Sequence, residues 1–321
     1  MGSPCTFLDL RFSGRYHPEG CFPFYGTRGA PTLSLASLVQ ALVSGALLGC
    51  FYALMALGFS MILGVSRSLN LAHGDLVVLG GYVGYSLWAA AGLSPVLLLP
   101  VAALALAPAA LVWEWLLKRT PEPKELSSLV LTFGLSLLLQ TVMRAIWRGE
   151  YRLIAESTLG ASLQLGTLAL NRGRVLAAAA ALAVVGLLWL ALTRTRWGQA
   201  VRATSIDPQA AALVGINVDG ARRSTFLLAL GLSGATGVLF ATLHYVHPAA
   251  GVELTLMAIV LSIWAGVGHL RSVLAAGLLL GMIEALTVTG WGPGWREPVV
   301  ALMLLGSLLA RSGGLARGHA H

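Results

Sequence analysis

The 321 residues are 57% hydrophobic and only 11% charged, and the net charge is +8. Because an ordinary soluble domain carries roughly 25% charged residues, this composition excludes that class and is typical of a membrane protein. The positive charge does not indicate nucleic-acid binding, since the Lys and Arg residues lie in connectors between apolar stretches, as the positive-inside rule describes.

Residues 1–32 contain scattered prolines, glycines and arginines, and no long apolar run. They lack the basic start, apolar middle and small-residue cleavage site of a signal peptide. We predict a poorly ordered tail over 1–32, a membrane domain over 33–310 and a short cytoplasmic tail over 311–321. The three cysteines show no spacing typical of a disulfide framework or a metal site.

Long runs without Asp, Glu, Lys or Arg predict membrane helices. They occupy 29–66, 76–113, 126–143, 175–193 and 224–252. A helix needs about 20 apolar residues to cross the bilayer core, so several runs are long enough to span and two have room for more than one crossing. The runs are continuous rather than alternating, which favours helices over a barrel. We expect an all-α fold, a polytopic transmembrane helical bundle of about eight to ten membrane segments.

Basic connectors orient these segments. Lys118, Arg119 and Lys124 mark one cytoplasmic connector, and the arginines of 194–223 mark another. Two predicted crossings lie between them, which is the even number that connectors on one side require. Arg144, Arg148 and Arg152 fall on the outer side and count against this topology. The remaining crossings are expected at 224–246, 254–268, 273–290 and 298–310.

A polar segment, Asn70-Leu71-Ala72-His73-Gly74-Asp75, interrupts two apolar stretches. One interpretation is a broken or re-entrant segment that lines a solute path, because polar groups at membrane depth face protein or a watery cavity. The other places the segment at the cytoplasmic surface, where Asn70 forms a turn and Asp75 caps the next helix. The neighbouring Arg67 favours the second interpretation, and contact of Asn70, His73 and Asp75 with a solute is a further hypothesis.

Glu284 stands alone as an acid about twelve residues inside an apolar segment, where a charge is costly and indicates a partner or a cavity. It is a second candidate for the solute path, and a structural hydrogen bond is an equally open explanation. Small residues at helical spacing predict close helix packing. These pairs are Gly45 with Gly49, Gly80 with Gly84, and Gly277 with Gly281.

Motifs for catalysis are missing from the sequence. No Gly-Lys-Ser/Thr phosphate loop and no Gly-x-Ser-x-Gly sequence occur, and His244 with His247 has no accompanying set of metal ligands. We therefore expect a protein that is not an enzyme, has no catalytic residue and binds no metal or cofactor itself. Any energy from ATP is expected to come from a partner that carries the phosphate loop.

The connector 194–223 predicts a short helix. Asp207 is a favourable N-cap residue and Pro208 suits the first helical position. Gly215 is suited to the left-handed conformation that ends a helix. A capped surface loop without further function is the alternative interpretation.

Two stretches then carry a resemblance. The first contains Arg202-Ala203, Asp207, Ala210-Ala211-x-Leu213-x-Gly215-Ile216-Asn217-Val218 and the later glycines Gly231, Gly234 and Gly237. The second contains Tyr52-Ala53-Leu54-x-Ala56-Leu57-Gly58 before the polar segment, and Gly81-Tyr82 after it. Both resemble the H-type permease subunits of branched-chain amino acid ABC importers, from about residue 33 to residue 310.

The resemblance implies a membrane-spanning subunit in a bacterial or archaeal plasma membrane. Its expected partners are a homologous permease subunit, two ATP-binding subunits, an extracytoplasmic substrate-binding protein, the transported amino acid or related solute, and lipid. It also implies that the short cytoplasmic helix docks on an ATPase. The residues assigned to this coupling are Arg202, Asp207, Ala210, Ala211, Leu213, Gly215 and Asn217.

The chain departs from the family pattern at two places. Many members carry Lys where Met257 stands, and a Gly-Gly pair with a Ser-x-Pro-Gly turn where 265–272 lies. Branched-chain and other amino acids, amides and urea all stay open as substrates. A secondary transporter or channel, and a non-transporting paralogue, remain alternatives.

Overall fold

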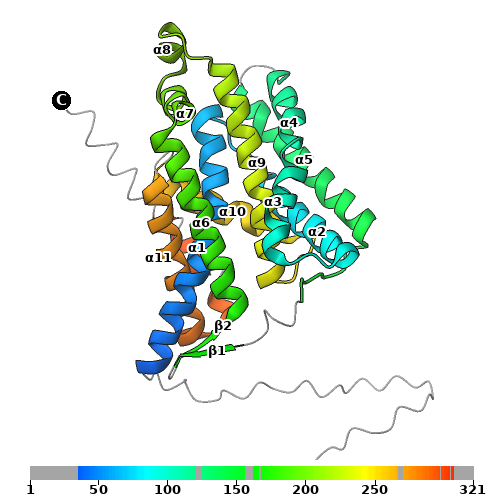
Figure 1. The fold of residues 1–321 in the computed structure, drawn as a ribbon, viewed down its shortest axis with the longest axis vertical. Helices are drawn as coiled ribbons and strands as arrows, with labels where there is room; N and C mark the ends of the chain where they lie inside the picture. The colour runs from blue at the N-terminus through cyan, green and yellow to red at the C-terminus, as the bar shows by residue number, and fades with distance from the viewer. Residues whose placement is uncertain are drawn as a thin grey trace, which may run out of the picture. The chain divides into compact units, whose positions relative to one another are not determined.

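The computed structural model describes residues 35–120, 124–155, 162–165, 168–266, 270–296, 298–303 and 305–306. The predicted tails 1–32 and 311–321, and residues 267–269 of the departure at 265–272, lie outside the described residues. Figure 1 shows the bundle. Its elements are α1 Leu35–Ser66, α2 His73–Ala91, α3 Pro95–Leu106, α4 Ala109–Lys118, α5 Lys124–Trp147, β1 Ser162–Leu165, β2 Leu168–Asn171, α6 Arg172–Arg194, α7 Arg196–Ile206, α8 Pro208–Leu213, α9 Val218–Leu243, α10 Ala250–Ala265, α11 Leu270–Trp291 and the 3₁₀ turn η1 Pro293–Trp295.

Six helices of the described chain are long and apolar enough to cross a membrane. The predicted all-α, polytopic bundle is therefore confirmed. The spans are Leu35–Ser66, Pro95–Lys118, Leu126–Trp147, Arg172–Arg194, Val218–Leu243 and Ser272–Trp291.

Two features of the fold differ from the expected segments. α10 has 16 residues, about 24 Å of helix, which is shorter than the hydrocarbon core of about 30 Å. The expected crossing at 254–268 is therefore a shorter helix that packs against α1, α2 and α11. A small antiparallel hairpin, in which Ser162 of β1 pairs with Asn171 of β2, precedes α6 and was not expected from the sequence.

α1 and α9 form the centre of the bundle. Burial covers 78% of the most apolar part of α1 and 72% of that of α9, against 28–39% in the other spans. A helix surrounded by protein is apolar on all sides, whereas the outer helices leave one apolar face for lipid or a neighbouring subunit.

The predicted glycine pairs are helix contacts. A Cβ placed on Gly45 would lie 2.5 Å from the carbonyl oxygen of Gly281, and one on Gly49 would lie 2.6 Å from that of Gly277. These distances are below van der Waals contact, so α1 and α11 approach closely only because both carry glycine. On α2, Gly80 meets Gly234 of α9 in the same way.

The predicted short helix is α8, and its cap is confirmed. Asp207 Oδ1 accepts hydrogen bonds from the backbone N–H groups of Gln209 and Ala210, at 2.9 and 3.1 Å. Pro208 is the first helical residue, and Gly215 has a φ of 85° just beyond the end. Figure 1 shows α8 at one extremity of the bundle, beyond the neighbouring end of α1. We call this the α8 end.

Candidate functional site

The polar segment 70–75 lies deep in the bundle rather than at its end. The His73 Nε2–H group donates to the Met55 carbonyl oxygen at 3.1 Å. Met55 precedes Ser66, the last residue of α1, by 66 − 55 = 11 residues, about 16 Å of helix. After α1 ends, the chain therefore turns back along α1 before α2 begins.

The contacts of this segment correct one interpretation from the sequence. Asn70 Oδ1 accepts from the Ala72 N–H at 3.0 Å, so the predicted turn at Asn70 is confirmed. Asp75 does not cap α2, because the N-cap residue is Ala72 and no side chain caps it. Asn70, His73 and Asp75 are at most 2% exposed, so other helices enclose their side chains. Asp75 makes a tertiary contact in place of a cap, since its Oδ2 accepts from the Ser136 hydroxyl of α5 at 2.5 Å.

Glycines bring α10 against the polar segment. The Gly74 N–H donates to the Thr255 hydroxyl of α10 at 2.8 Å. A Cβ on Gly74 would overlap the carbonyl oxygen of Gly251, and one on Gly251 would overlap the Asp75 carboxylate. The start of α2 is thus enclosed by α1, α5 and α10.

A row of polar side chains follows α5 and was missed in the sequence. Ser128, Thr132, Ser136 and Gln140 are all buried, and we call them the α5 polar ladder. Residues four apart share one helix face, so this spacing was the signal that the sequence offered. The opposite face carries exposed Val130, Phe133 and Leu137.

The α5 polar ladder is hydrogen-bonded along its length. The Leu71 N–H donates to the Thr132 hydroxyl at 3.2 Å, and Gln140 Nε2 donates to the Ser136 hydroxyl at 3.3 Å. Arg144 continues the row by donating to Gln140 Oε1 at 3.4 Å. Polar groups therefore run along α5 beside the polar segment of α2.

Glu284 belongs to a different cluster. The Tyr52 hydroxyl donates to Glu284 Oε2 at 2.7 Å, and Arg296, just after η1, pairs with Glu284 Oε1 at 2.5 Å and Glu253 Oε1 at 3.2 Å. Arg296 also donates to the Tyr52 hydroxyl at 2.9 Å. We call Tyr52, Glu253, Glu284 and Arg296 the Arg296 cluster. Arg296 and Tyr52 are thus the partners of Glu284 that the sequence did not reveal. None of these contacts involves Asn70, His73 or Asp75.

The two histidines considered as metal ligands contact different aromatic rings. His244 follows α9 and stacks on Phe240 with centroids 5.4 Å apart, while His247 lies 5.0 Å from the Tyr151 ring. Burial, with Arg296 and Arg174 nearby, lowers the pKa of His244 to about 4. His244 is therefore neutral at physiological pH and adds no charge beside the Arg296 cluster.

The residues assigned to ATPase coupling are distributed over α7, α8 and the start of α9. Arg202 lies on α7, not α8, and its guanidinium donates to the Leu192 carbonyl near the end of α6. Asn217 caps α9 through a hydrogen bond from the Gly220 N–H at 2.8 Å. Asp207 and Gly215 delimit α8. Most of this set therefore fixes the backbone path into and out of α8.

The side chains around α8 form two faces. Ala211 is buried, whereas the adjacent Ala210 is exposed. Leu213 is 89% exposed, and Ile206 and Val214 are each 77% exposed. The Arg67 guanidinium donates to the Ile206 carbonyl oxygen at 3.0 Å, so this region also contacts the connection between α1 and α2.

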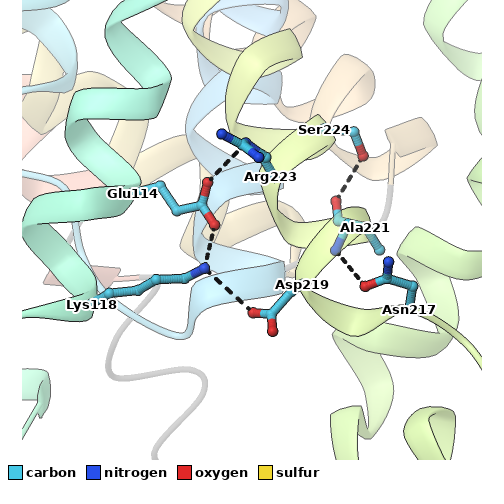
Figure 2. Close-up of polar contacts among 8 residues, drawn as sticks. Glu114, Lys118, Asn217, Asp219, Ala221, Arg223 and Ser224 are labelled. Carbon is cyan, nitrogen blue, oxygen red and sulfur yellow. Dashed lines mark hydrogen bonds and ion pairs between the residues drawn. The ribbon is translucent and has the colours of Figure 1, made fainter.

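Charged residues join α4 to the start of α9. Lys118 Nζ lies 2.8 Å from Glu114 Oε1 and 3.7 Å from Asp219 Oδ1, and Arg223 Nε lies 3.6 Å from Glu114 Oε2. Figure 2 shows the Glu114 carboxylate between Lys118 and Arg223. Asn217, the last of the residues assigned to ATPase coupling, is the N-cap of α9. Asp219 and Arg223 follow it in the first turns of α9, so these ion pairs connect α4 to the helix that begins directly after α8.

The first departure from the family pattern is also placed. Met257 is a buried apolar side chain on α10. α10 ends at Ala265, and Gly266 follows with a φ of 78°.

A family model described as the branched-chain amino acid transport system / permease component matches residues 41–308. The chain belongs to this family. It is a multi-pass membrane protein and the translocation subunit of an ABC importer. Its relatives include the high-affinity branched-chain amino acid transport system permease proteins LivH of Salmonella typhimurium, 27% identical over 87% of this chain and 96% of LivH, and BraD of Pseudomonas aeruginosa, 27% identical over 86% of this chain and 95% of BraD.

More distant relatives share a part of the chain. The fructose import permease protein FrcC of Rhizobium meliloti is 30% identical over 38% of this chain and 36% of FrcC. No solved structure matches.

Proposed function

We propose that this subunit forms the solute path of an ATP-driven importer of branched-chain or related apolar amino acids. Relatives that match over 86–87% of the chain carry branched-chain amino acid transport in their names, whereas the fructose permease matches over 38%. The proposed partners are a homologous permease, two ATP-binding subunits and an extracytoplasmic binding protein. The chain itself binds neither ATP nor another cofactor.

The observation that carries this proposal is the form of α8. A six-residue helix, capped at both ends, displays Leu213 beside the exposed Ile206 and Val214. Exposed apolar side chains on a short, well-fixed helix favour docking into a protein groove. We assign this surface to the ATPase and accordingly propose that the α8 end faces the cytoplasm at a bacterial or archaeal plasma membrane. We also propose a cytoplasmic C-terminus, which the basic residues Arg311 and Arg317 support through the positive-inside rule.

A contact between the α7–α8 region and the α1–α2 connection can transmit movement of α8 to the bundle. Arg67 bonds the Ile206 carbonyl oxygen, and the chain after Arg67 leads directly into Asn70, His73 and Asp75. A partner shifts a two-state equilibrium only through contacts that differ between the states. ATPase closure therefore acts by moving α7 and α8 relative to the α1–α2 connection.

The solute path itself is assigned to the polar segment and the α5 polar ladder. Asn70, His73 and Asp75 are buried, and Asp75 bonds Ser136 of the ladder. Polar residues at membrane depth mark solute paths and cavities. We do not assign Glu284 to the solute path, because its carboxylate is already bound by Arg296 and the Tyr52 hydroxyl.

Reconstitution tests the proposal. The chain is purified with the ATPases and second permease of its own genome and placed in liposomes with ATP inside and loaded binding protein outside. We expect ATP-dependent uptake of leucine, isoleucine or valine, and no uptake of fructose or a nucleoside. Uptake by the chain alone without ATP would contradict the proposal and favour a secondary transporter.

Coupling is tested on the buried face of α8. Ala211→Trp adds bulk where Ala211 packs, and is expected to leave ATP hydrolysis active while uptake falls about tenfold or more. Ala211→Ser changes the same buried position with little added bulk and is the matched control for helix stability. Normal uptake by Ala211→Trp would remove the coupling role from α8.

A further inference from the structure

A cavity of about 230 Å³ opens at the α8 end, between the ends of α1, α4, α5 and α9. It is smaller than a drug-sized pocket of roughly 300–1,000 Å³, so its ligand is a small solute. The lining residues that matter are Ser68, Glu114, Lys118, Ser128, Arg222 and Phe226.

The cavity carries charges of both signs. The buried Glu114 carboxylate stands on one side, with Lys118 Nζ at 2.8 Å. Arg222 lines the same space, and its buried Nε has no hydrogen-bond partner within the described residues. An unpaired guanidinium N–H favours a carboxylate ligand. Besides Lys118, the Glu114 carboxylate has a longer contact with Arg223, at 3.6 Å from Oε2, and an ammonium group on the ligand can hydrogen-bond to that oxygen.

The rest of the lining is apolar or hydroxylic. Leu117 and Phe226 contribute an apolar wall, and Ser68 and Ser128 contribute hydroxyls. Pockets that bind small molecules combine an apolar lining with a few placed polar groups. A zwitterion with an apolar side chain matches this lining: its carboxylate suits Arg222, its ammonium group suits Glu114, and its side chain suits the apolar wall.

The cavity also adjoins the assigned path. Ser128 is the first residue of the α5 polar ladder, and Ser136, two turns further along the same face, bonds Asp75. The cavity therefore lies at the point where the row of polar groups reaches the α8 end.

We propose that this cavity is an exit-side binding site for an amino-acid zwitterion, with Arg222 on its carboxylate, Glu114 on its ammonium group and Phe226 against its side chain. The proposal rests on the proposed function, since it gives the importer a second solute site after the path. Amino acid that accumulates in the cell binds there and slows further import.

Two arginines near the cavity provide a matched test. Arg222 lines the cavity, whereas Arg119 does not line it, is exposed and lies over the Trp115 ring at 4.1 Å. Binding of radiolabelled leucine is measured on the whole purified complex in nanodiscs, without the binding protein. We expect saturable binding that Arg222→Gln weakens about tenfold or more, while Arg119→Gln changes it by less than about threefold.

The ligand provides a test that needs no variant. Leucinamide keeps the ammonium group and loses the carboxylate, so it is expected to bind the unchanged complex about tenfold more weakly than leucine. Arg222→Gln is expected to bind leucine and leucinamide about equally. Absence of saturable leucine binding, equal binding of leucinamide by the unchanged complex, or an equal loss in both arginine variants would overturn the site.

ATP-driven uptake is measured on the same preparation. Uptake without leucine binding at this cavity would refute the site and leave the importer function standing. Binding that follows the Arg222 and leucinamide pattern without any uptake would refute the importer function and leave the site standing.

Discussion

Arg296 and Arg222 lie in two polar regions of the bundle that differ in one respect. Arg296 is occupied by its own chain, since Glu284, Glu253 and the Tyr52 hydroxyl surround its guanidinium. Arg222 lines a cavity, and none of the ion pairs among the described residues includes it. A charge whose counterions are internal stabilises one arrangement of helices, whereas a charge without an internal counterion is available for a ligand. The first region is therefore structural and the second is the candidate for binding.

The largest expected loss of stability is at the Arg296 cluster. Arg296→Met leaves the buried Glu284 carboxylate without its cation, and removal of one partner from a buried pair costs about 3–5 kcal/mol. Denaturation in mixed micelles measures this loss, with Glu253→Gln as the milder control because Glu253 is partly exposed. A loss below about 1 kcal/mol would show that the Arg296 cluster does not hold the helices together.

Glycine packing between α1 and α11 comes next. Gly281→Val forces side-chain atoms into the backbone of Gly45 and Gly49, and overpacking of this kind costs about 1–3 kcal/mol. Gly186→Val on α6 is the control, because nothing lies within 4 Å of a Cβ at Gly186. Equal stability of the two variants in the same denaturation assay would contradict the close α1–α11 contact.

An effect of similar size is expected at the polar segment. Ser136→Ala removes the hydroxyl that donates to Asp75, and a buried acceptor without its donor costs about 1–3 kcal/mol. Thr141→Ala on the exposed side of α5 is the control, since the Thr141 hydroxyl is exposed and bonds the Leu137 carbonyl of its own helix. Uptake measured on both variants adds a functional comparison, because Ser136 lies on the assigned path and Thr141 does not. Indistinguishable variants would argue that Asp75 and Ser136 do not depend on each other.

Local signals in the sequence predicted much of the fold. Uncharged length predicted the membrane helices, Asp207 with Pro208 predicted the start of α8, and glycine spacing predicted close helix packing without naming the helices that meet. Each of these depends on residues within a few turns of one another, where a sequence pattern has direct physical meaning.

These local patterns could not predict which side chains pair between helices that are distant in the sequence. Asp75 stands where a cap is plausible, but Ser136, 61 residues away, holds its carboxylate. The partner of Glu284 is Arg296, which lies beyond the end of α11 in a short connector. The sequence analysis treated this connector only as the end of one predicted membrane helix and the start of the next. The α5 polar ladder was readable from its four-residue spacing, although which helix it would face was not.

The central claim is that α8 couples a separate ATPase to solute passage, and Leu213 tests it most directly. Leu213→Asp places a charge on the proposed docking surface, while Leu213→Met keeps it apolar, and neither change enters the bundle because Leu213 is exposed. Co-purification of the ATPases and ATP-dependent uptake are measured for both. We expect both to be lost in Leu213→Asp and retained in Leu213→Met. A Leu213→Asp complex that assembles and transports as well as Leu213→Met would contradict the claim.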